Sequence, residues 1–193
     1  MIRNNSAINL VGAIWSINSE GWCPQASRQP SPNYNARPDS ADISLLVIHN
    51  ISLPAGQFGG NAITQLFQNR LDCGAHASFE SLRELKVSSH FLIRRDGALL
   101  QFVSALDRAW HAGVSSFNGR SSCNDFSIGI ELEGTDDVPF DAAQYEALRC
   151  LTHALLLRFA MTHIVGHSDI APGRKTDPGP CFDWARYQRD IST

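Results

Sequence analysis

Residues 45–49 read LLVIH, a short apolar run that ends in a histidine. A continuous run of branched apolar residues is typical of a strand that is buried on both faces inside a sheet. The residues RDG at 95–97 predict the turn of a β-hairpin between two further apolar runs. The strand-like runs outside LLVIH are residues 87–94, 99–103, 126–132 and 163–166.

Helical patterns alternate with these runs. Asn61 precedes a helix that we expect to reach Arg70, and a closing helix is expected over residues 182–191. The longest helix begins after Asp141, where Gln144 three residues later completes a capping box. Because helices and strands alternate and one strand pair is a hairpin, the fold class is α/β: a single domain with a central mixed β-sheet flanked by α-helices.

The composition is that of an ordinary globular domain. The chain has 193 residues, of which 43% are hydrophobic and 18% charged, and its formal net charge is -3. Nucleic acids and anionic membranes attract proteins with a basic field, which this chain lacks. We therefore expect no nucleic-acid partner and no membrane partner. We also expect a monomer.

The cysteine pattern predicts free thiols in a reducing compartment, which favours the cytoplasm. The five cysteines are widely spaced and form no CxxC pair: Cys23, Cys73, Cys123, Cys150 and Cys181. The mildly apolar stretch at residues 8–17 keeps a periplasmic location open as an alternative, if it acts as a signal. We interpret residues 1–20 as a flexible N-terminal extension and residues 21–193 as the domain.

Three residues could form a metal site. His49 and His167 each end an apolar strand-like run, and Asp177 lies in the stiff loop KTDPGP. Two imidazoles and a carboxylate are ligands for zinc, and three protein ligands leave a position open for water. The alternative is that both histidines are hydrogen-bonded core residues and that Asp177 forms a turn before Pro178.

Two charged residues could carry the chemistry of such a site. Glu131 interrupts the apolar run FSIGIEL and faces the same side of the strand as Glu133. Beside a metal it could act as general base and then pass the proton to a leaving amine. Lys175 could place a cation against a developing oxyanion. A salt bridge is the alternative for both residues.

Several segments together resemble a known family. They are LLVIHNISLPAGQFGG, VSSHFLIRRDG, RAWHAGVSSFNGR, CNDFSIGIELEGTDD and GHSDIAPGRKTDPGPCFDW. With PSPNYNARPD they span most of the chain from Gly21 to Trp184, and they resemble the cytoplasmic N-acetyl-anhydromuramyl-L-alanine amidases of the AmpD type. Those enzymes belong to a zinc amidase family that is shared with peptidoglycan-recognition proteins and phage lysozyme-amidases.

The resemblance implies a role for each matching position. His49, His167 and Asp177 are implied as zinc ligands, Glu131 as the catalytic glutamate, and Lys175 as the residue that stabilises the transition state. The implied reaction is hydrolysis of the bond between anhydro-N-acetylmuramic acid and L-Ala of the stem peptide, in the recycling of wall fragments. Recycling also limits β-lactamase induction where that circuit exists. The residues implied in binding the muropeptide are Asn50, Lys86, His90, Ala109, Trp110 and Arg120.

Two positions depart from the family pattern. Lys86 stands where an arginine is frequent, which keeps the charge but loses the bidentate fork. Ser122 replaces a second arginine, so Arg120 is the cation left to bind a peptide carboxylate. Neither departure affects a metal ligand or the glutamate.

Two other functions remain open. An exported amidase acting on intact peptidoglycan would share the same residues but not the location. A module that binds muropeptides without cutting them would be expected to lack a zinc ligand, whereas all three ligand positions are present here.

A structural zinc site would need a fourth ligand, for which Cys181 is the nearest candidate in the sequence.

Overall fold

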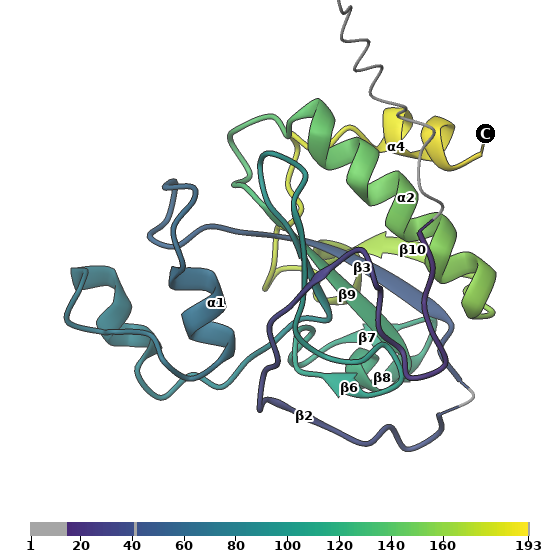
Figure 1. The fold of residues 1–193 in the computed structure, drawn as a ribbon, viewed down its shortest axis with the longest axis horizontal. Coiled ribbons are helices and arrows are strands. Elements are labelled where there is room, and N and C mark those ends of the chain that lie inside the picture. Colours follow the sequence, from purple (N-terminus) through teal and green to yellow (C-terminus); the bar gives the residue numbers. More distant parts are fainter. Residues whose placement is uncertain (1–14, 41, 193) are drawn as a thin grey trace, which may run out of the picture.

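The protein is described by a computed structural model that covers residues 15–40 and 42–192 (Figure 1). A six-stranded sheet forms its centre, in the order β1-β5-β4-β9-β3-β10. Only β4 and β5 pair antiparallel, whereas the other neighbours in this sheet pair parallel. The strands are β1 (Ser27–Arg28), β3 (Leu45–Ile51), β4 (Phe91–Ile93), β5 (Leu99–Gln101), β9 (Ser127–Glu133) and β10 (His163–Gly166). The predicted mixed sheet is confirmed.

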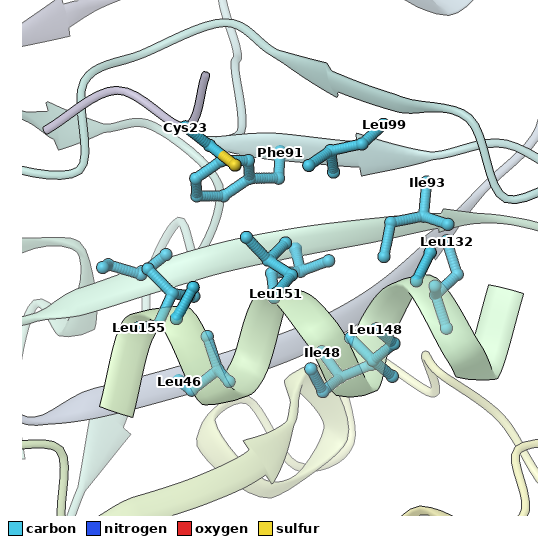
Figure 2. Packing of buried hydrophobic residues seen from close by; sticks show 14 of the residues in the cluster. Cys23, Leu46, Ile48, Phe91, Ile93, Leu99, Leu132, Leu148, Leu151 and Leu155 are labelled. Carbon is cyan, nitrogen blue, oxygen red and sulfur yellow. The ribbon is translucent and has the colours of Figure 1, made fainter. Parts of the chain in front are cut away.

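Helix α2 (Ala142–Arg158) covers one face of the sheet, and α4 (Trp184–Ile191) packs beside it (Figure 1). Leu148, Leu151 and Leu155 of α2 face the sheet across a buried apolar layer (Figure 2). The strands contribute Leu46, Ile48, Phe91, Ile93 and Leu132 to this layer. Because successive strand side chains point to opposite faces, His49 lies on the face turned away from α2.

The start of α2 shows the predicted capping interaction. The Asp141 backbone N–H donates to Gln144 Oε1 over 3.1 Å, and the helix begins at the next residue. The predicted hairpin is also confirmed, because the Arg94 N–H donates to the Ala98 carbonyl over 2.9 Å. Gly97 has a φ of 84°, a conformation that glycine adopts without strain.

A segment between β3 and β4 covers the opposite face near β4 and β5. It contains α1 (Ala62–Phe67) and a 3-10 helix at Ala77–Leu82, and it lies far from α2 (Figure 1). Ile63, Leu66 and Phe67 of α1 pack against Leu92 and Leu100 of the sheet in a second apolar cluster. This segment forms one wall of the site described below.

Helix α1 is shorter than predicted. It ends at Phe67 and not at Arg70, because Asn69 adopts the left-handed conformation with a φ of 57°. Asn61 occupies the N-cap position, but its side chain makes no capping hydrogen bond. The predicted strand 87–94 is also shorter, because β4 spans only Phe91–Ile93. Before β4, the Ser88 hydroxyl donates to the Asn33 carbonyl and the Ser88 N–H donates to the Trp110 carbonyl, so Ser88 does not pair with the neighbouring strands of the sheet.

The remaining elements are short. They are β2 (Tyr34–Asn35), which pairs with β6 (Arg108–Ala109), the pair β7 (Ser116–Phe117) and β8 (Arg120–Ser121), a 3-10 helix at Cys123–Asp125, and α3 (His167–Ile170). Most of the predicted N-terminal extension, residues 1–14, lies outside the described residues. Ile17 is buried against the main apolar cluster, and the boundary at residue 20 stays a prediction.

All five cysteines lie in the described ranges and are free thiols. Across those same ranges, no helix has the length and apolar character needed to cross a membrane.

Candidate metal centre and catalytic site

Two adjacent parallel strands deliver the first two site residues. His49 of β3 and Glu131 of β9 are register partners, so their side chains leave the sheet on the same face. Both lie near the carboxyl end of their strand, where ligand sites of parallel sheets are found. His49 is only 1% exposed, and its backbone is held by pairing with Glu131 of β9, while the pairing of β3 with β10 ends at the preceding residue, Ile48.

The next two donors come from the turn that follows β10. His167 is the first residue of α3, and Asp177 lies in the loop that follows that helix. The loop is held against α3 because the Ser168 N–H donates to the Asp177 carbonyl over 3.0 Å. Gly166 permits this close approach, since a Cβ at that position would lie 2.7 Å from Pro178.

The donor atoms of His49, His167 and Asp177 form a tight triangle. The two Nδ1 atoms are 3.0 Å apart, and Asp177 Oδ2 lies 3.0 Å from His49 Nδ1 and 3.1 Å from His167 Nδ1. Residues 49, 167 and 177 thus offer one ligand atom each to a single metal ion. The structure therefore brings together the three predicted ligands.

The hydrogen bonds around the triangle fit a metal site. His167 Nε2 lies 3.1 Å from the Ala112 carbonyl, which only accepts, so the ring proton of neutral His167 is on Nε2. Its Nδ1 then points a lone pair at the Asp177 carboxylate, which is also an acceptor. Two acceptors in contact need a cation between them, and two imidazoles with a carboxylate suit a divalent transition metal.

The charge states of the donors agree with this arrangement. Burial lowers the pKa of His49 to about 4, so the imidazole is neutral at pH 7 with a free lone pair. Burial alone would raise the pKa of Asp177, but contacts with His167 and His49 outweigh it and hold that pKa well below its ordinary value. The carboxylate therefore stays ionised.

Glu131 is the buried acid of the site. Among the described residues no hydrogen-bond donor reaches its Oε2, which is buried. Burial raises the pKa of Glu131 well above its ordinary value, the Asp177 charge raises it further, and Lys175 opposes both. A carboxyl group in such a position is suited to accept and release a proton near neutral pH.

A cavity of about 240 Å³ contains the triangle, Glu131 and Lys175. Its other wall is apolar and comes from the α1 segment, with Leu66, Phe67 and Leu82 among its residues. A larger polar groove of about 760 Å³ lies alongside and shares Lys175 and Asp177 with it. Of the two cavities, the smaller one contains the histidines and Glu131, so it is the candidate site.

Residues 39–180 match the family described as N-acetylmuramoyl-L-alanine amidase. The chain belongs to this family. Its amidase family and its fold are therefore those that the sequence motifs predicted. The matched region contains every donor of the triangle, together with Glu131 and Lys175.

Relatives of this amidase have similar sequences and structures. The chain is 56% identical over 171 residues to the 1,6-anhydro-N-acetylmuramyl-L-alanine amidase AmpD of Citrobacter freundii. The matched residues cover 88% of this chain and 91% of that protein. The chain superimposes with a TM-score of 0.88 on a crystal structure of a selenomethionine AmpD derivative at 55% identity, covering 89% of this chain and 97% of that chain. The structure of AmpDh3 from Pseudomonas aeruginosa in complex with anhydromuramic pentapeptide is 32% identical, with a TM-score of 0.58 and coverage of 79% and 61%.

The segment around residue 110 contributes one predicted binding residue to the cavity of the amidase. Trp110 lines the cavity, and its Nε1 donates to Asn35 Oδ1 over 2.7 Å, which fixes the ring. Ala109 is fully buried in β6 and does not line the cavity. His90 is also fully buried, with Nδ1 accepting from the Gly129 N–H and Nε2 donating to the Asp107 carbonyl.

The structure distributes the other predicted binding residues over separate places. Asn50 lines both cavities, but its amide donates to Asp136 and to the Pro178 carbonyl and so braces the Asp177 loop. Lys86 lines a small cavity of about 80 Å³ beside α1. Arg120 pairs with Asp42 and lies over the Phe126 ring, away from the triangle.

The sequence did not predict two buried residues that support the site. Arg37 is buried and donates to the carbonyls of Asn124, Asp125 and Ser127 over 3.1, 3.1 and 2.8 Å. The Nδ1 atom of His111 lies 2.9 Å from His49 Nε2. An arginine between Ala36 and Pro38 carries no signal of burial, so only the fold reveals the role of Arg37.

Proposed function

We propose that this amidase uses zinc to hydrolyse the amide between 1,6-anhydro-N-acetylmuramic acid and L-Ala of the stem peptide. The substrate is inferred from the relatives, since the Citrobacter protein is named for that activity and the Pseudomonas structure contains an anhydromuramic pentapeptide. The observation that carries the mechanism is the Glu131 carboxyl group, which lines the same cavity as the donor triangle and whose buried Oε2 has no hydrogen-bond partner among the described residues.

Zinc fits the donor set. His49, His167 and Asp177 would hold the ion through two nitrogens and one oxygen, which leaves a coordination position open. When bound, zinc supplies Lewis acidity that polarises the scissile carbonyl and makes water acidic near neutral pH. The Nε2 atom of each histidine faces a hydrogen-bond partner away from the triangle, His111 for His49 and the Ala112 carbonyl for His167, so Nδ1 is the nitrogen left for the ion.

Glu131 moves the proton. Its carboxylate takes a proton from the attacking water, and the water oxygen forms the new bond to the lactyl carbonyl carbon. As the C–N bond breaks, the protonated Glu131 gives that proton to the amino group of L-Ala, so the carboxylate is regenerated. The Lys175 ammonium at the mouth of the cavity stabilises the negative charge that develops on the carbonyl oxygen.

The cavity is suited to the substrate. Its apolar wall and Trp110 can pack against a rigid bicyclic sugar, while the polar groove alongside gives the attached peptide room. We further propose that the protein acts in the cytoplasm, in the recycling of wall fragments, as its free cysteines favour. Lys86, His90, Ala109 and Arg120 lie outside this cavity, so direct substrate contact is proposed for Trp110 and Asn50.

One experiment tests the proposal. Purified, zinc-loaded protein is incubated with anhydro-muramyl tripeptide, with and without a chelator, and the products are followed by mass spectrometry. We expect release of free tripeptide that stops on chelation and returns when zinc is added. Release only from intact peptidoglycan would instead support the exported amidase, and no release from either substrate would support a binding module.

A further inference from the structure

Behind the metal triangle lies a chain of buried polar side chains that the proposed reaction does not use. It starts at His111, whose Nδ1 is 2.9 Å from His49 Nε2, and it continues from His111 Nε2 to Ser127 Oγ over 3.2 Å. His111 is 9% exposed and Ser127 fully buried. The chain therefore connects a metal ligand to a hydroxyl group inside the protein.

The directions of the hydrogen bonds follow from the ligand role of His49. If its Nδ1 offers a lone pair to the metal, the proton of the neutral ring is on Nε2 and is donated to His111 Nδ1. The single proton of His111 is then on its own Nε2, which faces the Ser127 hydroxyl. One arrangement of protons thus satisfies the whole chain.

The protein holds the His111 ring in place from several sides. Gly129 of β9 lies directly beneath it, because a Cβ there would come within 2.5 Å of His111 Cγ. The Asn124 side chain accepts from the backbone N–H groups of His111 and Ala112 over 3.1 and 2.8 Å. The His90 ring meets the His111 ring edge to face, at 5.6 Å between centroids. These contacts leave the ring little freedom to turn.

We propose that His111 is a positioning residue for the metal centre. It accepts the Nε2 proton of His49 and thereby fixes both the tautomer and the orientation of that ligand, while Gly129 provides the space. The second hydrogen bond of a metal-bound histidine typically changes metal affinity by about 10- to 100-fold. The inference rests on the proposed function, because it assumes that the triangle binds zinc.

The test uses three variants of the full-length protein and measures zinc affinity by competition with a chromogenic chelator. In His111→Asn the side-chain oxygen is bonded to Cγ, as Nδ1 is, so it can accept from His49. In His111→Gln the amide lies one atom further out, towards the position of Nε2. We expect affinity to fall about 10- to 100-fold in His111→Ala and His111→Gln and to stay close to wild type in His111→Asn.

Further measurements separate positioning from a general effect on folding. Thermal unfolding of each metal-free variant is recorded, since a purely structural role would lower zinc affinity in step with stability and would not distinguish Asn from Gln. His153→Asn serves as the control, because His153 bonds to the Ile191 carbonyl far from the triangle. Gly129→Ala retains every hydrogen-bonding group but displaces the ring, and we expect it to lower zinc affinity as well.

The imidazole nitrogens give a readout independent of affinity. In a long-range proton–nitrogen spectrum of the zinc-loaded wild type, we expect the proton of His111 on Nε2. A proton on Nδ1, or unchanged zinc affinity in His111→Ala, would overturn the inference and leave the proposed function standing. If the wild-type protein failed to bind zinc, the proposed function would fail with it.

Discussion

His49 and Glu131 are register partners on neighbouring parallel strands, yet their side chains serve different parts of the chemistry. His49 points its Nδ1 at the metal triangle, whereas Glu131 Oε2 stays without a donor among the described residues. The same two strands therefore position a ligand and a proton acceptor whose roles can be separated by substitution.

Replacing Glu131 by glutamine should abolish most turnover and leave zinc bound. The amide has nearly the same shape but cannot carry the proton, so we expect kcat to fall roughly 100- to 10,000-fold. Steady-state kinetics and the zinc content of the same sample check this. Near-normal kcat in Glu131→Gln would show that another group is the base.

Replacing His167 by alanine should instead remove the metal, because it deletes one corner of the triangle. We expect less than one zinc per protein after dialysis, measured by elemental analysis. His163→Ala is the matched control: it lies on the same strand-to-helix segment, is exposed and contacts the Phe117 ring. Retention of one zinc per protein by His167→Ala would contradict the ligand assignment.

The same Glu131→Gln substitution should stabilise the metal-free protein above about pH 5. The pKa of Glu131 is raised in the folded state from its ordinary value of 4.5, so the unfolded chain loses this proton first as pH rises. Wild type therefore loses stability from pH 4.5 up to the raised pKa, by about 1.4 kcal/mol for each pKa unit of difference. Glutamine does not ionise, so chemical denaturation should show two curves that meet below pH 4.5 and diverge above it.

Replacing Lys175 by methionine should lower kcat and leave zinc content unchanged. Loss of one donor to a developing oxyanion typically reduces kcat by roughly 100- to 1,000-fold. Arg149→Met removes the same charge from a surface ion pair with Glu146 on α2 and serves as the control. An equal loss of kcat in both variants would point to a long-range charge effect and not to Lys175.

Trp110 and Arg120 should differ in their effect on KM. Trp110→Ala removes an aromatic wall of the cavity, and we expect KM to rise about tenfold, which corresponds to about 1.4 kcal/mol. Arg120→Ala should leave KM unchanged, because Arg120 pairs with Asp42 and lies over Phe126. Initial-rate measurements with one muropeptide decide between them, and a larger effect of Arg120→Ala would mean that the peptide reaches that side.

The sequence predicted the sheet, the hairpin and the long helix because each depends on local patterns. The run LLVIH, the turn RDG and the pair Asp141 and Gln144 each act over a few residues, and the structure confirms all three. The end of α1 was predicted wrongly, because the left-handed Asn69 is set by contacts with Asn33, 36 residues away.

The sequence predicted only those site residues that lie at the ends of strand-like runs or in a stiff loop. His49 ends the apolar run LLVIH, His167 directly follows β10, and Asp177 lies between prolines, so their convergence could be inferred. The positions of His90 and Arg120 could not, because neighbours in the sequence do not reveal which side of a loop a side chain takes. The role of His111 depends on a glycine 18 residues further on, a pairing that no short-range pattern contains.

The triangle also joins backbone of two different kinds. His49 belongs to a strand that is hydrogen-bonded on both sides, whereas Asp177 belongs to a loop whose preceding residues, 172–176, are exposed. Local opening of a loop takes less free energy than unfolding of a central strand. On heating, the loop should therefore release the metal while the sheet is still intact, and the temperature at which the enzyme stops working would lie below its melting point. Efforts to make this amidase durable would begin at the Asp177 loop and not in the apolar core.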